Sequence, residues 1–432
     1  MNSKNSVNQK FMNRNKFLIS ALFVAFVVVQ AISQPLTLDQ VLEKVERNNP
    51  MLAGYKSRAE ALEKYAEGAT AWMAPMAGIG TFMTPYPALG GHDPEHLDEN
   101  GELDQGSLMI SVEQTIPNKN KLQANKKYML ERSKSEELRR LQQWNELRYE
   151  AREAYYTWSL ALEKLRKLDQ TEQILTLLSE SASIRVAYNQ GPATAVYRAQ
   201  ARIAEIKNMR SMIEASITEQ QVRLSTLMNI PEEEPFTIQP ITGLQQTLAL
   251  SDTSSLAVRR SDILGIDQEI KVMKLNQRIQ SLQNKPDVRL RFDHMQSYSN
   301  MPDQFTAMAM FTIPVAPWSA KMYKAEVAGM SREIDAMKQE RSARLLETRG
   351  MLNRMSAQIK GMTAQLRRYE EEILPALSRN YDALKIAWEE NREQLPMVLD
   401  GLEALTMAEQ EYLEKKESLF IMTAAYEKLL EN

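Results

Sequence analysis

The 432-residue sequence contains no cysteine and only 15 glycines. Without cysteine there is no disulfide, no thiol catalysis and no thiolate-ligated metal site, and no lipid-modified cysteine can anchor the chain to a membrane. Scarce glycine is typical of a chain dominated by long helices. Neither sign of charge dominates, because 53 Lys and Arg nearly balance 56 Asp and Glu. Basic residues are dispersed among acidic ones, so nucleic acid is not an expected partner.

Long apolar runs are missing after the first 30 residues. A basic segment is followed by thirteen mostly apolar residues from Phe17 to Val29, and then by small residues around Ser33. This order predicts a signal peptide over residues 1–33 and an exported mature chain. Thirteen residues fall short of the about 20 that a membrane-spanning helix needs, which disfavours the alternative of an uncleaved anchor. Membrane residence of the mature chain would therefore require β-strands.

The two halves of the sequence share landmarks at a nearly constant spacing. Asn49-Pro50 aligns with Arg260-Ser261, Thr115-Ile116-Pro117 with Thr312-Ile313-Pro314, and Ala187-Tyr188 with Ala387-Trp388. The spacing predicts two repeats, 34–228 and 256–432, joined by an irregular linker over 229–255 that packs on the outside. A doubled unit favours a symmetric assembly over a single enzymatic cleft.

Each repeat is expected to contain two strands. The predicted strands are Ala74–Tyr86, Ser107–Ile116, Asp287–Gln296 and Gln304–Val315. In the third, Val288, Leu290 and Phe292 alternate with charged residues. One apolar and one polar face suits a barrel wall between lipid and a watery lumen, although a soluble sandwich strand shows the same alternation. Four strands cannot close such a barrel, so several chains would have to contribute.

Very long helices follow the strands in each repeat. Helical patterns run from Lys121 to Tyr188 and from Ala320 to Trp388, on the order of 100 Å each. Sustained heptad spacing predicts coiled-coil packing, and Pro375 is expected to bend the second helix. Turns at 189–192 and 391–396 lead into return helices ending near Met228 and Leu430. Asn48-Asn49-Pro50 predicts a break in the helix that opens the first repeat.

Several local strings, in this order, resemble the TolC-like outer-membrane efflux family. They include Leu36-Thr37-Leu38-Asp39 with Asn48-Asn49-Pro50, Thr115-Ile116-Pro117 before a long helix, and Glu372-Ile373-Leu374-Pro375. The tip with Tyr188 and Gly191, and the tip with Val398-Leu399-Asp400, are similar to the family's two hairpin tips. The resemblance covers essentially the whole mature chain.

The resemblance implies a mainly α fold with a membrane β-barrel portion. Three chains would form a twelve-stranded barrel in the outer membrane, continued by a periplasmic α-helical barrel. The lumen would be the exit duct for an inner-membrane pump and its periplasmic adaptor, without a cofactor. Residues expected to face the barrel lumen are Glu113, Arg289, Arg291 and Asp293.

The resemblance also places the periplasmic entrance at the second hairpin tip. Asp400 occupies a position that is acidic in the family, whereas Met397 stands where a second acidic residue is expected. Glu393 lies near a site that is basic in some members. The ring of acidic residues at the entrance is therefore expected to be reduced.

The three histidines show no pattern of catalysis. None has a paired nucleophile or a helix-spaced ligand partner, so the chain is not predicted to be an enzyme. They lie with methionines in or beside the predicted outer loops, and the candidate metal contacts are His92, His96, His294, Met295 and Met301. Such side chains suit soft Cu(I)-like ions and suggest a copper- or silver-exporting branch. The alternative is that polar loops collect histidine and that methionine fills irregular gaps.

Two other classes of protein share part of this pattern. A periplasmic adaptor also has a signal peptide and a helical hairpin, but it has one hairpin flanked by glycine-rich β-domains. A purely structural coiled-coil protein of the cell envelope explains the heptads but not the alternating strands. The sequence therefore favours the channel.

Overall fold

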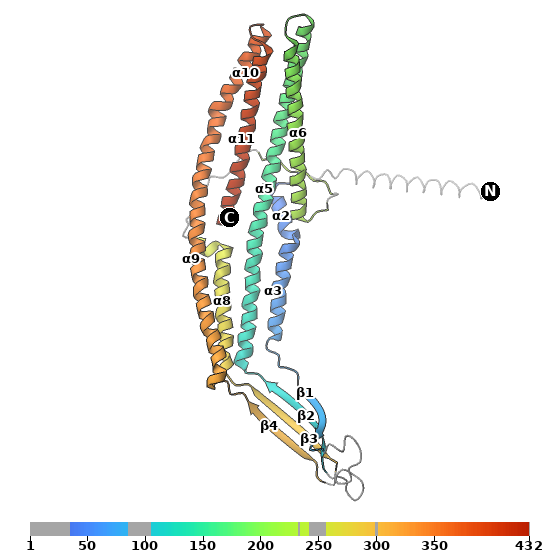
Figure 1. Cartoon of the computed structure of the whole chain (residues 1–432), viewed down its shortest axis with the longest axis vertical. Helices are drawn as coiled ribbons and strands as arrows, with labels where there is room; N and C mark the ends of the chain where they lie inside the picture. The colour runs from blue at the N-terminus through green and yellow to red at the C-terminus, as the bar shows by residue number, and fades with distance from the viewer. Residues whose placement is uncertain (1–34, 85–104, 232–233, 242–255, 299–300, 432) are drawn as a thin grey trace, which may run out of the picture.

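The computed structural model describes residues 35–84, 105–231, 234–241, 256–298 and 301–431. The predicted signal peptide, His92, His96 and most of the predicted linker lie outside the described residues. The chain is elongated, with helices along most of its length and a sheet at one end (Figure 1). No helix in the described ranges combines the length and the apolar character needed to cross a bilayer.

Among the described residues, the first half of the chain contains four helices and two strands. They are α2 (Leu38–Asn48), α3 (Pro50–Gly68), β1 (Met76–Phe82), β2 (Ser107–Ile116), α5 (Lys119–Ala187) and α6 (Ala193–Met228). The second half follows the same order of element types. It contains α7 (Leu256–Arg259), α8 (Ser261–Ser281), the 3-10 turn η3 (Leu282–Asn284), β3 (Val288–Ser297), β4 (Gln304–Phe311), α9 (Pro317–Arg368), the π-helical turn η4 (Tyr369–Ile373), α10 (Leu374–Glu389) and α11 (Leu395–Leu430). The predicted strands and long helices are confirmed, with β1 shorter at both ends than expected.

Local chemistry explains where the first helices begin and end. Thr37 caps α2, because its hydroxyl accepts from the Gln40 amide while the Gln40 side chain accepts from the Thr37 amide. Asn49 has an extended backbone and caps α3, whose first residue is Pro50. Proline cannot continue a hydrogen-bonded helix but suits a first turn. The predicted break at Asn49 is therefore confirmed.

The irregularity predicted at Pro375 takes the form of a π-helical turn. Five residues, Tyr369–Ile373, adopt this wider winding, and Pro375 is then the second residue of α10. Proline lacks an N–H and its ring crowds the carbonyl four residues earlier. A wider turn relieves that conflict and lets the helix continue instead of ending.

The four strands form one antiparallel sheet in the order β1-β2-β3-β4. Its centre is the pairing of β2 with β3, which joins the two halves of the chain. The register is continuous from Ser107 opposite Ser297 to Ile116 opposite Val288. β1 and β4 are the edge strands.

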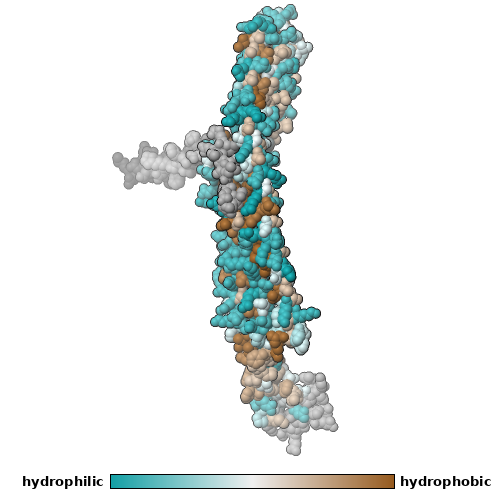
Figure 2. All heavy atoms as spheres, turned by 90° about the vertical axis from the view of Figure 1, so that its left-hand side faces the viewer, coloured by the Kyte–Doolittle hydropathy of each residue, from teal (hydrophilic) through white to brown (hydrophobic). Residues whose placement is uncertain are grey.

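Three apolar clusters hold the helical part together. The first joins α2, α5 and α6 with Phe236 and Ile238 from the segment after α6. The second lies near the hairpin tips and combines Leu168 and Ala199 with Val398 and other residues of both hairpins. The third joins α7, α9 and α11. The face of the helical shaft seen in Figure 2 is mainly hydrophilic.

The segment after α6 packs against the helices where it is described. Leu36 and Ile238 form a parallel bridge, and the hydroxyl of buried Tyr155 donates to the carbonyls of Leu36 (3.0 Å) and Gln239 (2.7 Å). Both chain segments are thereby fixed to α5. Residues 234–241 of the predicted linker therefore pack against the helices.

A buried carboxylate fixes α5 to α8. Glu131 accepts from Gln268 (2.9 Å) and pairs with Lys271 (2.6 Å) and Lys134 (3.2 Å). Burial alone raises the pKa of this carboxyl, but the hydrogen bonds from Gln268, Lys271 and Lys134 outweigh it and lower the pKa of Glu131 to about 2. The charged form is therefore the one that the fold stabilises.

The interactions of Glu131 predict how the thermal stability of the protein changes in acid. Since the folded pKa lies below the unfolded value of 4.5, the stabilisation is complete above pH 4.5 and is lost as the pH falls towards 2. The full effect is about 3 kcal/mol. We expect wild-type protein to unfold at a higher temperature than Glu131→Gln at pH 7, with the difference vanishing near pH 2, as measured by circular dichroism. A difference that is independent of pH would contradict this assignment.

Candidate functional site

The charged residues of the sheet lie together on one face. In the register, Glu113 stands opposite Arg291 and Ser111 opposite Asp293, so their side chains share a face with Arg289. Arg291 Nε donates to Asp293 Oδ1 at 2.8 Å. Arg289 Nε lies 3.1 Å from Glu113 Oε1, an ion pair without a directed hydrogen bond. The structure thus brings the four residues of the predicted lumen together in two neutral pairs.

The opposite face of the sheet is apolar and open to solvent in the single chain. Ile79 is 75% exposed, Phe305 70% and Phe311 63%. Asp293 on the charged face is only 4% exposed. A water-soluble sheet buries its apolar face and exposes its charges. Here the apolar face is exposed, whereas Asp293 is buried and Glu113 and Arg291 are partly buried, which is the reverse arrangement for these residues.

The apolar face is continuous across all four strands. Its apolar members are Ala77, Ile79, Leu108, Ile110, Val112, Ile116, Val288, Leu290, Phe292, Phe305, Ala307, Ala309 and Phe311. Phe292 and Phe305 stack with ring centroids 5.9 Å apart. Apolar surface also gathers where the helices meet the sheet (Figure 2). A patch of this extent on a folded protein marks a contact with another apolar phase or protein.

The structure separates the candidate metal contacts. His294 and Met295 are consecutive in β3, so His294 lies on the apolar face and Met295 on the charged face. His294 Nε2 is 4.0 Å from Asp303 Oδ2. Among the described residues, no group of three or more His, Asp or Glu is arranged to hold a metal ion. Adjacent strand residues point in opposite directions, so the structure does not bring His294 and Met295 together.

The two hairpin tips are built alike and are joined to each other. Asn189 and Asn391 each adopt a left-handed backbone in the tip turn, with φ of 53° and 58°. Arg185 at the end of α5 lies over the Trp388 ring, 4.3 Å from its centroid. Its guanidinium donates to the Trp388 carbonyl at 3.0 Å and to Asn391 Oδ1 at 2.8 Å. One arginine thus fixes the second tip to the first hairpin.

The acidic residue predicted at the entrance is paired within its own chain. Asp400 on α11 accepts from Arg198 on α6, and Glu403, about one turn further along, accepts from Arg202. Both carboxylates are partly exposed. Met397 and Glu393 are also exposed at this tip. The sequence analysis missed Arg198 and Arg202, although their four-residue spacing on α6 complements the acidic residues on α11.

Comparisons with known proteins identify the fold. No protein-family model matches the chain, and no curated protein matches its sequence. Solved structures do match. The outer-membrane channel OprN has a TM-score of 0.74 at 15% identity, with 91% of this chain and 89% of that chain covered. CusC, described as forming a transmembrane channel, has a TM-score of 0.74 at 10% identity, with 93% and 95% covered.

A third match is the open state of the Neisseria gonorrhoeae MtrE outer-membrane channel. Its TM-score is 0.71 at 14% identity, with 91% of this chain and 88% of that chain covered. The chain therefore has the fold of the TolC-like outer-membrane channels, which confirms the resemblance found in the sequence. OprN and CusC match equally well, so the likeness favours no particular branch of that fold.

The contacts of Arg185 predict how the second tip is held. Arg185→Ala removes a charged hydrogen-bond donor and a cation–π contact from the Trp388 turn. We expect backbone amides of residues 388–394 to exchange at least about tenfold faster with solvent deuterium, which corresponds to about 1.4 kcal/mol. Arg392→Ala is the matched control, since Arg392 pairs with Glu390 within the same turn. Equal exchange in both variants would argue against the role of Arg185.

Proposed function

We propose that this protein is the outer-membrane exit duct of a tripartite efflux or secretion system. In this proposal it is a homotrimeric channel without catalytic activity, and it passes substrates from an inner-membrane pump across the periplasm and the outer membrane. The observation that carries the proposal is the reversed sheet, with apolar residues outside and charged pairs on the sheltered face. Lipid on one side and water on the other is the environment that makes such a sheet stable.

The open sheet supports assembly from several chains. β1 and β4 have unpaired edges in the single chain, and an edge within lipid leaves backbone groups without hydrogen bonds. Closing the sheet into a barrel removes those edges. Three chains supply twelve strands, the number that the family resemblance implies. The lumen-facing residues are then Glu113, Arg289, Arg291 and Asp293.

Matching features of the two halves support an internal repeat. Asn49 and Arg260, which precede α3 and α8, have nearly the same backbone angles. The left-handed residues Asn189 and Asn391 are 202 positions apart, as are Asn229 and Glu431 at the ends of α6 and α11. We propose repeats over 34–228 and 256–432 with a linker over 229–255. Three doubled chains would place six hairpins around one duct.

The long helices suit a passage across the periplasm. α5 alone has 69 residues, about 100 Å at 1.5 Å per residue. Its hairpin tip exposes apolar side chains at Leu177, Ile184, Tyr188 and Tyr197. We propose that the tips meet the periplasmic adaptor and the inner-membrane pump. An adaptor or a structural coiled coil would not require the reversed sheet.

Two neighbouring residues of β3 test the placement of the sheet. Leu290→Arg puts a charge on the face proposed to contact lipid, at a cost of about 2–4 kcal/mol per chain near the bilayer midplane. We expect loss of heat-labile trimers from detergent-extracted outer membranes. Arg291→Gln keeps a hydrogen-bond donor beside Asp293, so it should leave trimers intact and shift ion selectivity in planar bilayers towards cations. Wild-type protein that stays a water-soluble monomer would refute the proposal.

The Asp400–Arg198 pair tests the proposed entrance. If Asp400 lines the narrowest point, Asp400→Ala should weaken block of single-channel current by multivalent cations about two- to fivefold. Arg198→Ala should strengthen the block, because it leaves the carboxylate unpaired. If Asp400→Ala and Arg198→Ala change the cation block in the same direction, the pair only holds α6 against α11. Glu403→Ala is the control one turn away.

A further inference from the structure

The apolar face of the sheet has two small side chains on its edge strand β4, between two large ones. Along β4 this face carries Phe305, Ala307, Ala309 and Phe311 in turn. Alanine is depleted in strands, and a larger side chain at an exposed position of an apolar face would cover more apolar surface. The two alanines therefore call for a physical reason.

The alanines leave a groove beside the large side chains of β3. Ala307 is the cross-strand partner of Phe292, and Ala309 is the partner of Leu290. We call the cavity around them the β4 groove; its volume is about 490 Å³, and its lining on the apolar face is Val112, Gln114, Leu290, Phe292, Ala307 and Ala309. Phe305 closes the groove towards the loops, since its ring stacks on Phe292 with centroids 5.9 Å apart.

The length of the groove matches one leaflet of a bilayer. Phe305 and Phe311 bound it, and the strand between them is about 20 Å long at about 3.3 Å per residue. A strand tilted by about 40° covers about 15 Å of membrane depth over that length, which is half of the about 30 Å hydrocarbon core. The groove therefore has the depth of a single acyl chain.

The end of the groove next to the helices suits a phospholipid headgroup. After β4 the chain leads to Trp318 in the first turn of α9, which is 83% exposed. Tryptophan is enriched at the membrane–water interface. Lys285 and Lys321 are exposed in the same region, whereas Asp287 is already paired with Lys121 (2.7 Å). Positive charge is thus available for a lipid phosphate at this end.

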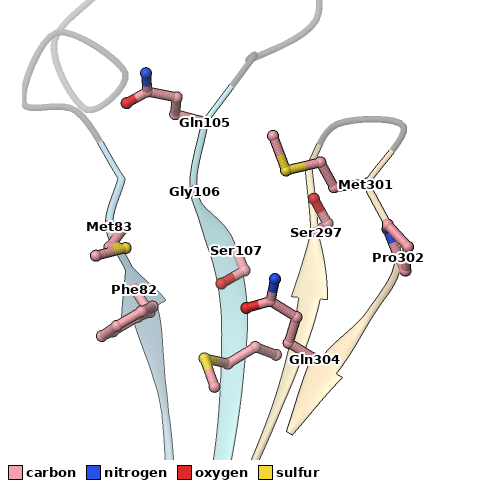
Figure 3. A pocket seen from close by; sticks show the side chains of 10 residues that line it. Phe82, Met83, Gln105, Gly106, Ser107, Ser297, Met301, Pro302 and Gln304 are labelled. Atoms are coloured by element: carbon pink, nitrogen blue, oxygen red, sulfur yellow. The ribbon is translucent and has the colours of Figure 1, made fainter.

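A second hollow, at the loop end of the sheet, has a different character. Its volume is about 290 Å³, and Ser107, Ser297 and Gln304 are among the residues that line it (Figure 3). The register places these three residues on the charged face of the sheet. A hydrocarbon chain there would take polar groups out of water at a cost in free energy. The loop-end hollow is therefore not a site for an acyl chain.

We propose that the β4 groove binds one acyl chain of a glycerophospholipid, with the headgroup at the end next to Trp318. This inference rests on the proposed duct, because the apolar face is then in contact with lipid and the leaflet next to the helices is the periplasmic one. β4 is an edge strand, so in a closed barrel the groove lies at the seam between two chains. A lipid held there contacts both chains and so stabilises the trimer.

The first test is a titration of phosphatidylglycerol onto full-length processed trimers in detergent, with bound lipids counted by native mass spectrometry. We expect one tightly bound lipid per chain. Ala307→Leu combined with Ala309→Leu fills the groove and keeps the face apolar, so it should weaken this binding at least about tenfold. Ile110→Phe is the matched control, because it adds apolar volume at an exposed position of the same face, on β2 outside the groove. Equal affinity in wild-type protein and the double variant would overturn the proposal.

Cross-linking locates the lipid without any substitution. Wild-type protein is placed in vesicles of phosphatidylethanolamine and phosphatidylglycerol that carry a diazirine on one acyl chain. A diazirine near the methyl end should label Phe305 and Ala307, and one near the ester should label Ala309 and Phe311. Labels spread evenly over the apolar face, or found in the reverse order, would overturn the proposal. Preferential labelling of the groove by lipopolysaccharide, the lipid of the other leaflet, would also overturn it.

The same preparation separates the two proposals. Trimers that conduct ions but show no groove-dependent lipid binding would overturn the lipid site and leave the duct standing. Groove-dependent binding in membrane-inserted protein that never conducts would overturn the duct and leave the lipid site standing. Trimer content is measured for every variant, so that a folding defect is seen as such.

Discussion

The structure depends on a sheet whose apolar and charged faces are exchanged relative to a soluble protein. Burial of apolar surface stabilises folding by roughly 25 cal/mol per Å². In the single chain the apolar face of the sheet is exposed, so it does not contribute this stabilisation. On the other face, Asp293 is buried and pairs with Arg291, and Glu113 is partly buried and pairs with Arg289. Both facts are accounted for at once if lipid covers one face and water wets the other.

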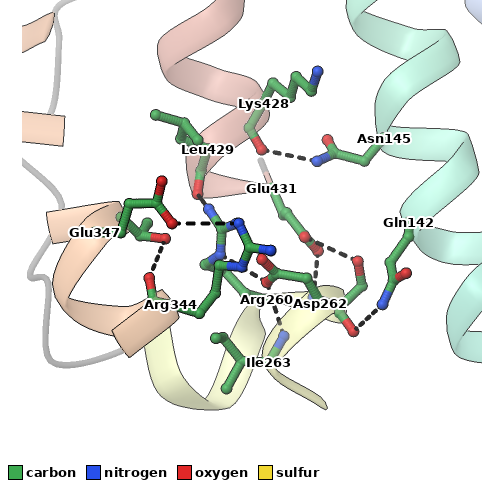
Figure 4. A network of polar contacts seen from close by, with 12 residues as sticks. Gln142, Asn145, Arg260, Asp262, Ile263, Arg344, Glu347, Lys428, Leu429 and Glu431 are labelled. Atoms are coloured by element: carbon green, nitrogen blue, oxygen red, sulfur yellow. Dashed lines mark hydrogen bonds and ion pairs between the residues drawn. The ribbon is translucent and has the colours of Figure 1, made fainter. Parts of the chain in front are cut away.

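In the helical part, two long hairpins lie side by side without a thick apolar core between them. The apolar clusters are narrow and local, so the hairpins need further contacts along their length. α5 and α11 supply them as ion pairs, including Lys164–Glu417 (2.8 Å), Lys167–Glu409 (2.7 Å) and Lys416–Glu163 (2.9 Å). At the far end of α11, Glu431 accepts from the Ser261 amide and hydroxyl, and Arg260 donates to the Leu429 carbonyl (Figure 4). These contacts join the end of the chain to the start of α8.

Sequence periodicity predicted those features that depend on local geometry. Alternation along β3 placed Arg289, Arg291 and Asp293 on one face, because side chains of a strand must alternate. The same rule places His294 and Met295 on opposite faces. The pairing of Asp400 with Arg198 could not be found this way, since it depends on how α6 packs against α11 across 202 residues of sequence.

Closure of the sheet constrains how chains must meet in the proposed trimer. An edge strand from the first half, β1, would pair with an edge strand from the second half, β4, of the neighbouring chain. A shift of one residue at that seam would turn one chain's charged face towards lipid, so the register between chains is strongly specified. The contact between β1 and β4 joins two different surfaces of the chain. Such contacts form a closed ring only when repeating the rotation between neighbouring subunits leads back to the first subunit. In a closed barrel, strand number, tilt and stagger are linked, so the seam between chains must continue the tilt and stagger of the four strands within each chain.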